Sequence, residues 1–447
     1  MKKIFILLLL TSFSAIVSCK KLVSIDSPPD QLTPDKVFNN ASSVKAATVD
    51  MYTLLGTVDQ NFIPPVGTYT DELVTTRVDA TSSEFSKSLL TPVNSSVLSI
   101  WQNLYATIYK ANAIITGLQV TVTIPDSIKN QCLGEALFMR AYSHFLLTNI
   151  FGDVPLVTTT NVTLNASAKR ASSTVVNQQV IADLKQAALL LPTAYTGDGE
   201  KVRANKWAAT ALLAKVYLFT GDFPDAESEA SLIINSGQYT LTDLNSVFLA
   251  NSNEAILQLW NINGYTTLNS VPFSGIATYQ VATSLLNSFE SGDNRLNAWV
   301  NSTVLSGTTY YYPYKYKLNS PSSGGSSEYT MYLRLGDIYL IRAESRAQQN
   351  NLAGAATDLN AIRNRAGLSG TLAGTQSTML SAIYHERQVE LFDEAGNRFF
   401  DLKRAGIINT VLGQIKPLWK PTGNLFPIPQ SDGLKDPFLT QNTGYTN

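Results

Sequence analysis

Apolar residues recur every three or four positions along much of this chain, which is the pattern of amphipathic helices. Between 99 and 118, Ile100, Leu104 and Ile108 fall on one helical face. A second run with the same period begins after Pro125 and stops before Gly152, where a helix would end. The pattern predicts helices near 33–55, 99–118, 126–151, 173–191, 203–220, 223–236, 328–349, 352–366, 376–395 and 398–413.

Two stretches, 58–98 and 238–330, lack the helical period and are rich in loop-forming residues. Within the second stretch, Glu254 to Trp260 alternates in polarity, which predicts a short strand. Large loops inserted in a helical scaffold usually carry function. We therefore look for a ligand site in these two stretches.

Two of the predicted helix pairs share a spacing of small residues. Ala214 is followed after 12 residues by Ala226, and Ala343 after 12 residues by Ala355. Small side chains at these positions let two antiparallel helices approach closely, as in a tetratricopeptide repeat. A chance similarity between two amphipathic hairpins is the alternative, and we favour repeat-like units.

Composition excludes several classes of function. Charged residues make up 15% of the 447 residues and the net charge is −1, so binding to nucleic-acid phosphates is not expected. The chain has two histidines, which argues against histidine-based hydrolysis and histidine-rich metal sites, and no nucleotide-binding motif is present. We expect no cofactor and no metal. Cys132 lies in an apolar helical pattern and is expected to be a buried, inert thiol.

The first nineteen residues have the order of a secretory signal. Met1-Lys2-Lys3 is basic, Ile4 to Leu10 is apolar, and Ile16-Val17-Ser18-Cys19 resembles a bacterial lipobox. The resemblance implies that residues 1–18 are removed and that Cys19 is lipidated, which anchors residues 19–447 to a membrane surface. An ordinary signal peptide with a chance cysteine is the alternative.

Several blocks along the whole length carry a family resemblance. They are Lys20 to Asp26, Trp101 with Tyr105 and Asn112, Glu135 with Arg140, Phe151 to Leu156, Gly292 to Arg295, Leu333 to Glu344, Asp358 to Leu368, Glu386 to Glu390, Arg398 to Arg404, Leu425 to Pro429 and Gln441 to Tyr445. In this order they resemble the SusD/RagB outer-membrane nutrient-binding lipoproteins of Bacteroidetes-type bacteria. Lys20 and Lys21 are basic where the export signals of such lipoproteins are often acidic, which leaves the final leaflet open.

The resemblance implies a mainly α fold, a SusD-like superhelix of tetratricopeptide-like hairpins with inserted loops and short β-strands. It implies an N-terminal part at about 20–235, a loop-rich ligand region at about 238–330 and a C-terminal part at about 270–447. It also implies a non-enzymatic lid on a SusC-like TonB-dependent transporter, lipid-anchored at Cys19 in the outer membrane and exposed on the cell surface. The implied cargo is a glycan, with an oligopeptide as the alternative; a helical glycoside hydrolase is a further alternative.

Sugar rings stack their apolar face on aromatic side chains, while polar side chains bond the hydroxyl groups. By this logic the residues expected to contact ligand are Arg77, Asp79, Asn94, Trp260, Tyr265, Trp299, Tyr311 and Tyr312. The tyrosine-rich loops would serve equally well as a contact with the transporter, because tyrosine is enriched in interfaces. Glu386 and Glu390 lie one helical turn apart; a structural ion network is favoured for them over acid–base chemistry.

Overall fold

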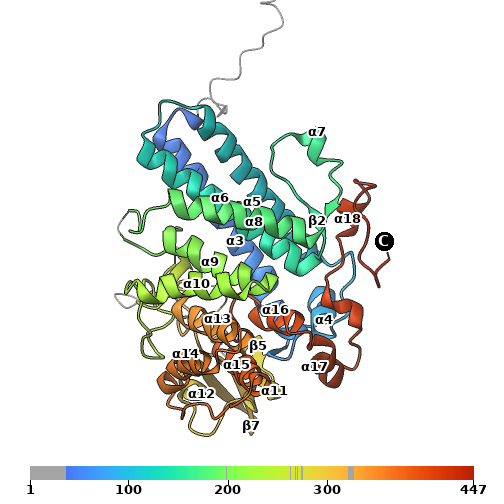
Figure 1. Cartoon of the computed structure of the whole chain (residues 1–447). Coiled ribbons are helices and arrows are strands. Elements are labelled where there is room, and N and C mark those ends of the chain that lie inside the picture. The colour runs from blue at the N-terminus through green and yellow to red at the C-terminus, as the bar shows by residue number, and fades with distance from the viewer. Residues whose placement is uncertain are drawn as a thin grey trace, which may run out of the picture.

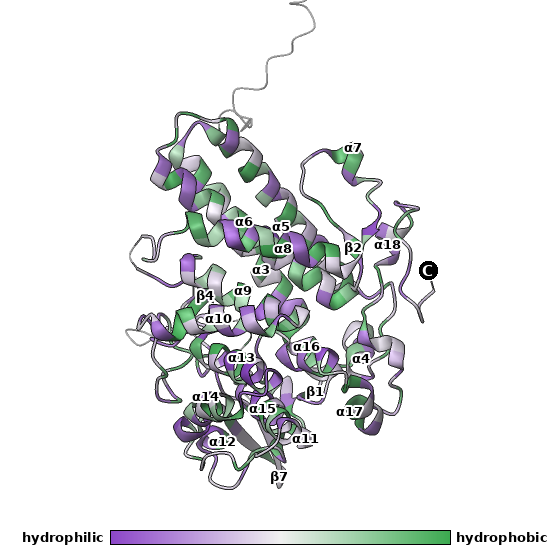
Figure 2. Cartoon of the chain, viewed as in Figure 1, coloured by the Kyte–Doolittle hydropathy of each residue, from purple (hydrophilic) through white to green (hydrophobic). Residues whose placement is uncertain are grey.

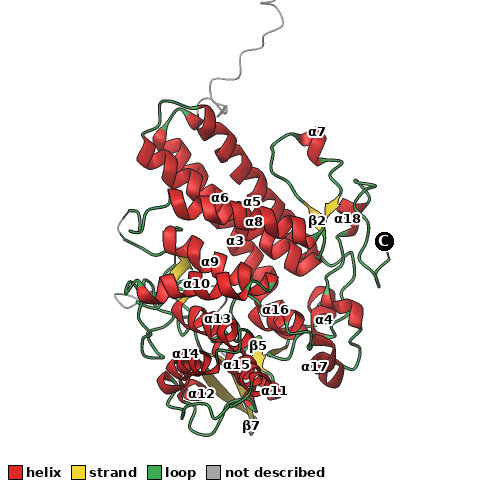
Figure 3. Cartoon of the chain, viewed as in Figure 1, coloured by secondary structure: helices red, strands yellow, loops and turns green. Residues whose placement is uncertain are grey.

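The computed structural model describes residues 37–446 except 198, 262, 267, 269, 273, 274 and 321–326. Helices dominate the described residues, and short strands pair two by two, as Figure 3 shows. The prediction of a mainly helical scaffold is confirmed. The predicted signal peptide and Cys19 lie outside the described residues. Within the described part of the chain, no helix has the length and apolar character that a membrane span requires.

The elements keep one numbering throughout, shown in Figure 1. The helices are α3 (Ala41–Tyr69), α4 (Ala80–Ser86), α5 (Ser95–Val120), α6 (Asp126–Phe151), α7 (Val162–Asn165), α8 (Ser173–Leu190), α9 (Lys206–Thr220), α10 (Phe223–Asn235), α11 (Thr283–Leu286), α12 (Asn294–Trp299), α13 (Leu335–Gln348), α14 (Leu352–Arg365), α15 (Gln376–Glu390), α16 (Asn397–Arg404), α17 (Ile408–Ile415), α18 (Gln430–Gly433) and the 3-10 helix η3 (Pro421–Asn424). The antiparallel strand pairs are β1 (Leu73–Thr75) with β5 (Tyr279–Val281), β2 (Val154–Pro155) with β3 (Arg170–Ala171), β4 (Ala255–Leu259) with β8 (Thr330–Arg334), and β6 (Val300–Leu305) with β7 (Thr308–Pro313).

The long helices α3, α5, α6 and α8 pack side by side in the upper half of the molecule (Figure 1). Each of these helices carries both apolar and polar residues (Figure 2). The predicted apolar stripe of Ile100, Leu104 and Ile108 is completely buried. Asn94 begins α5 by accepting the N–H groups of Ser96 and Val97. Cys132 is a buried free thiol in this core, as predicted.

Two helical hairpins, α9–α10 and α13–α14, continue the scaffold below the bundle. Ala214, Ala226, Ala343 and Ala355 have no exposed surface, and in each hairpin the two helices pack against each other, so the small residues identified in the sequence are buried in the packed scaffold. Gly221 ends α9 with a φ of 79°, a left-handed conformation that favours glycine.

Helix α3 is longer than predicted and passes through Pro64 and Pro65. The prediction of irregular chain from 58 onward is therefore wrong as far as Tyr69. Phe62 lies 5.7 Å from the Phe400 ring and Tyr69 lies 5.3 Å from the Phe426 ring, measured between centroids. This aromatic burial holds the helix together although each proline removes a backbone donor.

Two other predicted helices differ from the structure. The expected helix at 328–349 begins as strand β8, because Thr330 to Arg334 pairs with β4 about 75 residues earlier in the chain, and becomes helical only at Leu335. The expected helix at 398–413 is divided into α16 and α17 around Gly406, which has a φ of 71°.

A buried network of ion pairs joins the loop-rich middle of the chain to the last helices. Arg334 contacts Glu254 at 2.8 Å, Glu390 at 2.6 Å and Glu394 at 2.7 Å. Arg295 contacts Glu386 at 2.6 Å in the same cluster. Glu386 and Glu390 are both fully enclosed, so the structural interpretation of these two carboxylates is confirmed.

Candidate functional site

Strand pairing brings together two loops that lie about 200 residues apart in the chain. Thr75 on β1 is in register with Tyr279 on β5, and the N–H of Thr76 donates to the carbonyl of Thr278 at 3.0 Å. The chain then turns through Arg77 into α4. The pairing therefore places Arg77 beside Tyr279, two residues that no local pattern connects.

Arg77 and Asp79 form a solvated pair next to that tyrosine. Arg77 Nε donates to Asp79 Oδ2 at 3.2 Å, and the two side chains are 55% and 47% exposed. Asp79 also begins α4 by accepting the N–H of Ser82 at 3.0 Å and its hydroxyl at 2.9 Å. These bonds from Ser82 lower the pKa of Asp79, which is ionised at neutral pH. The bond to Asp79, followed by the charge of Tyr279, raises the pKa of Arg77.

We name Arg77, Asp79 and Tyr279 the Arg77 face. The recess that Tyr279 lines beside this face has a volume of only about 20 Å³, and its other walls are Pro65, Phe85 and small hydroxyl side chains such as Thr75, Thr81 and Ser82. The β6–β7 hairpin lies beside β5, and its Tyr311 is 41% exposed. A cation, a carboxylate, the half-buried Tyr279 phenol and the exposed Tyr311 phenol together offer donors, acceptors and flat apolar area to a ligand lying across the surface.

Three of the residues predicted to contact ligand are instead built into the protein. Trp299 has no exposed surface; its Nε1 donates to the Leu244 carbonyl at 2.8 Å and its ring faces Lys315 Nζ at 4.7 Å. Asn94 is 2% exposed and is used as the cap of α5, and Tyr312 is 6% exposed. The prediction is corrected for these three, since a side chain enclosed on all sides has no face left for a sugar.

Trp260 and Tyr265 lie elsewhere, on the chain that follows β4. Trp260 is 51% exposed and borders a hollow along α3, whereas Tyr265 is half-buried. Sequence reasoning missed Tyr279 and Asp59. Tyr279 becomes a candidate only through the β1–β5 pairing, and Asp59 lies in the part of α3 that was expected to be irregular.

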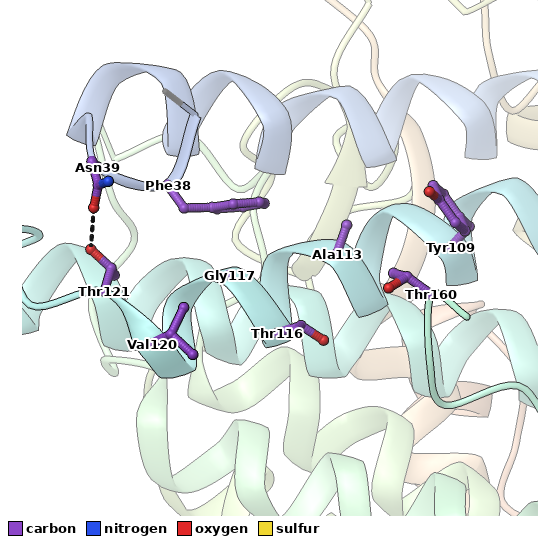
Figure 4. Close-up of a pocket in the computed structure, with 9 residues that line it drawn as sticks. All are labelled: Phe38, Asn39, Tyr109, Ala113, Thr116, Gly117, Val120, Thr121 and Thr160. Atoms are coloured by element: carbon purple, nitrogen blue, oxygen red, sulfur yellow. Dashed lines mark hydrogen bonds between the residues drawn. The ribbon is translucent and has the colours of Figure 1, made fainter. Parts of the chain in front are cut away.

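A separate groove of about 390 Å³ lies between the chain before α3 and helix α5. Figure 4 shows the Phe38 ring over Gly117, with Tyr109 and Val120 at the ends of the groove. Thr121 Oγ1 donates to Asn39 Oδ1 at 3.0 Å and holds the entering chain in place. The lining carries no charged side chain. Among the described residues, no group of three His, Cys, Asp or Glu side chains is placed to hold a metal ion.

Comparison with known families agrees with this architecture. Residues 25–218 match a family model described as "Starch-binding associating with outer membrane", and residues 293–445 match a model described as "SusD family". The chain belongs to the SusD/RagB family. The two matches lie on either side of the loop-rich segment that contributes Trp260 and Tyr279.

Relatives of this SusD-family chain are similar along their whole length. One SusD-like protein of Formosa agariphila is 22% identical and covers 99% of this chain and 98% of its own. Another SusD-like protein of the same organism is 26% identical and covers 97% and 95%.

Solved structures share the fold. A SusD superfamily protein from Bacteroides vulgatus has a TM-score of 0.79 at 21% identity, covering 91% of this chain and 100% of that chain. A protein titled as a laminarin-binding SusD-like protein has a TM-score of 0.78 at 24% identity, covering 90% and 99%. The surface glycan-binding protein A from Bacteroides fluxus has a TM-score of 0.76 at 22% identity, with the same coverage. At these identities the likeness is one of fold.

Proposed function

We propose that this SusD-family protein is a non-catalytic, lipid-anchored glycan-binding protein of the outer membrane that works with a SusC-like TonB-dependent transporter. The observation that carries the proposal is the Arg77 face, where a half-exposed ion pair lies beside the Tyr279 ring. Two proteins of the same fold are named as laminarin-binding and glycan-binding, which supports a saccharide as the ligand. Cys19 would carry the lipid anchor.

The position of the carboxylate pair supports the proposal of a non-catalytic protein. Glu386 and Glu390 are enclosed and bonded to arginines, so neither can reach a glycosidic bond with its proton or lone pair. On the Arg77 face, the bonds from Ser82 keep Asp79 ionised, so Asp79 is not suited to donate a proton to a glycosidic bond. The face is therefore suited to holding a glycan rather than cleaving it.

Calorimetry of residues 20–447 against neutral and acidic oligosaccharides and peptides, with product analysis of the same mixtures, tests this function. We expect saturable glycan binding without cleavage. Arg77→Ala and Tyr279→Ala should each weaken it by about fivefold or more, because each removes one hydrogen-bonding or stacking partner.

Tyr109→Ala is the control, because Tyr109 is an exposed aromatic residue that lines the separate groove of Figure 4. Released product would contradict the non-catalytic function. Binding of peptides alone would replace the glycan by an oligopeptide, and equal loss in the Tyr109 control would remove the Arg77 face as the site.

A further inference from the structure

A hollow of about 630 Å³ runs along the middle of α3, and none of the three residues of the Arg77 face lines it. One wall is α3, which contributes Gly56 and Asp59; the others are the α8–α9 connection with Glu200 and the chain after β4 with Trp260. Strand β4 runs beside α9 at the left of the molecule in Figure 2. We name this hollow the Trp260 pocket.

The apolar part of the pocket is formed by Leu259 and Trp260. Leu259 packs directly on α3 because Gly56 has no side chain; a Cβ at that position would lie 3.2 Å from Leu259 Cδ2. Trp260 is 51% exposed, so one part of the indole is fixed against the protein and the other faces the solvent. A flat, preformed apolar ring of this kind binds the C–H face of a sugar at a small cost in entropy.

The polar part of the pocket consists of acceptors and amides. Asp59 is 7% exposed and accepts the Tyr332 hydroxyl through Oδ2. Glu200 accepts the Tyr329 hydroxyl at 3.2 Å. Asn261 and Asn263 add amide donors and acceptors at the border of the pocket.

The arginine of the pocket is already neutralised. Arg203 donates to the buried Glu135 at 2.7 and 3.1 Å, and the Tyr52 hydroxyl donates to the same carboxylate at 2.8 Å. Asp59 and Glu200 therefore face the cavity without a free guanidinium between them. An anionic ligand would meet the Glu200 carboxylate and the buried Asp59 carboxyl group without a free cation to balance its charge, whereas a neutral ligand would supply hydroxyl groups that can bond to both.

We propose that the Trp260 pocket is a second saccharide site, separate from the Arg77 face, that takes the rings of a neutral sugar chain and rejects uronate or sulfated rings. This rests on the proposed function, in which the ligand is a glycan. Helix α3 connects the two sites: Gly56 lines the Trp260 pocket and Thr68 lines the recess beside Tyr279, twelve residues further along the helix, a rise of about 18 Å.

The test uses residues 20–447 and five probes. Four are neutral hexasaccharides, namely maltohexaose, cellohexaose, laminarihexaose and xylohexaose, and the fifth is the anionic hexagalacturonate. Binding is measured by calorimetry. Occupancy of the pocket is measured as protection of Trp260 fluorescence from acrylamide, taken as the difference between the native chain and Trp260→Phe. At least one neutral hexasaccharide should protect Trp260, and Trp260→Ala should weaken its binding at least tenfold at this site while Arg77→Ala leaves the protection intact.

Tyr109→Ala is the matched control for Trp260→Ala, since the two side chains are 50% and 51% exposed. Suppose that a neutral hexasaccharide binds the native chain, that Arg77→Ala abolishes this binding, and that no probe protects Trp260. This result would overturn the second site and keep the proposed function. Protection by hexagalacturonate would overturn the neutral class. No binding by any of the five probes would overturn both proposals.

Discussion

Asp59 is a buried carboxyl group on α3 whose partner is a tyrosine. Burial raises its pKa from the ordinary 3.8 to about 7, and the hydrogen bond from the Tyr332 hydroxyl offsets only part of this rise. Within the described part of the chain, Asp59 forms no ion pair that would hold its charge. The residue therefore gains a proton at a pH where an exposed aspartate is fully ionised.

This difference makes the free energy of unfolding depend on pH. Between about pH 4 and pH 7 the folded chain holds a proton on Asp59 that the unfolded chain has lost, so the contribution of Asp59 to stability falls as pH rises through that window and is constant above it. The pKa shift from 3.8 to about 7 corresponds to about 4 kcal/mol, at about 1.4 kcal/mol per unit.

Asp59→Asn should remove the decrease in the free energy of unfolding that Asp59 causes between about pH 4 and pH 7. Relative to the native chain, the variant should gain stability from pH 4 to pH 7, by at most about 4 kcal/mol, measured by urea unfolding at a series of pH values. The variant must be compared with the native chain because Asp393 is another buried carboxyl group whose pKa is raised to about 7. Asp393 titrates in the native chain and in Asp59→Asn alike, so its effect cancels in the difference. Parallel pH profiles for the two proteins would show that Asp59 has an ordinary pKa.

At the scale of elements, the approach of one segment to another depends on glycines in helices. Gly117 lies in the middle of the contact between α5 and the chain before α3, and a Cβ there would overlap the Phe38 ring (Figure 4). A helical glycine is about 1 kcal/mol less favourable than alanine, so Gly117 is retained against helix propensity. Glycine is tolerated at this helical position because any larger residue would displace the Phe38 ring.

Gly117→Ala should therefore destabilise the protein by about 1–3 kcal/mol, the usual cost of overpacking, although alanine favours the helix. Gly413→Ala on α17 is the control: a Cβ there meets nothing within 4 Å, so it should stabilise by about 0.5–1 kcal/mol. Adding Phe38→Ala to Gly117→Ala should recover part of the loss. Equal stabilisation by the two alanines would contradict the contact.

At the scale of the whole molecule, the buried ion network fixes the loop-rich middle against the last helices. Arg334 at the end of β8 reaches three carboxylates, Glu254, Glu390 and Glu394, and all of these side chains are at most 5% exposed. Ion pairs of this kind contribute little net stability compared with apolar packing, but removing one member leaves uncompensated buried charge. The network therefore determines which arrangement of the segments is tolerated.

Arg334→Ala should lower the free energy of unfolding by about 3–5 kcal/mol, measured by denaturant unfolding. Arg77→Ala breaks an exposed pair and should change it by less than about 0.5 kcal/mol, which also makes it a sound variant for binding experiments. If the two variants unfold at the same denaturant concentration, the loss of Arg334 does not leave a destabilising buried charge and the role given to the network is wrong.

The sequence by itself determined the elements that depend on neighbouring residues. The stripes of α5 and α6, the glycine that ends α9 and the small residues inside both hairpins are all visible in the local pattern, because helix hydrogen bonds and caps join residues a few positions apart. The tertiary structure decided what depends on distant partners. Aromatic rings from the end of the chain extend α3 past its prolines, and β4 turns the expected start of α13 into a strand.

The same division applies to the ligand sites. The aromatic and polar residue types of the loops were visible in the sequence, but their exposure was not: Trp260 and Trp299 belong to one loop-rich region and are 51% and 0% exposed. Arg77 acquires Tyr279 as a neighbour only when β1 pairs with β5. Burial and long-range strand pairing are properties of the packed chain, so the tertiary structure alone decided which of these side chains can touch a ligand.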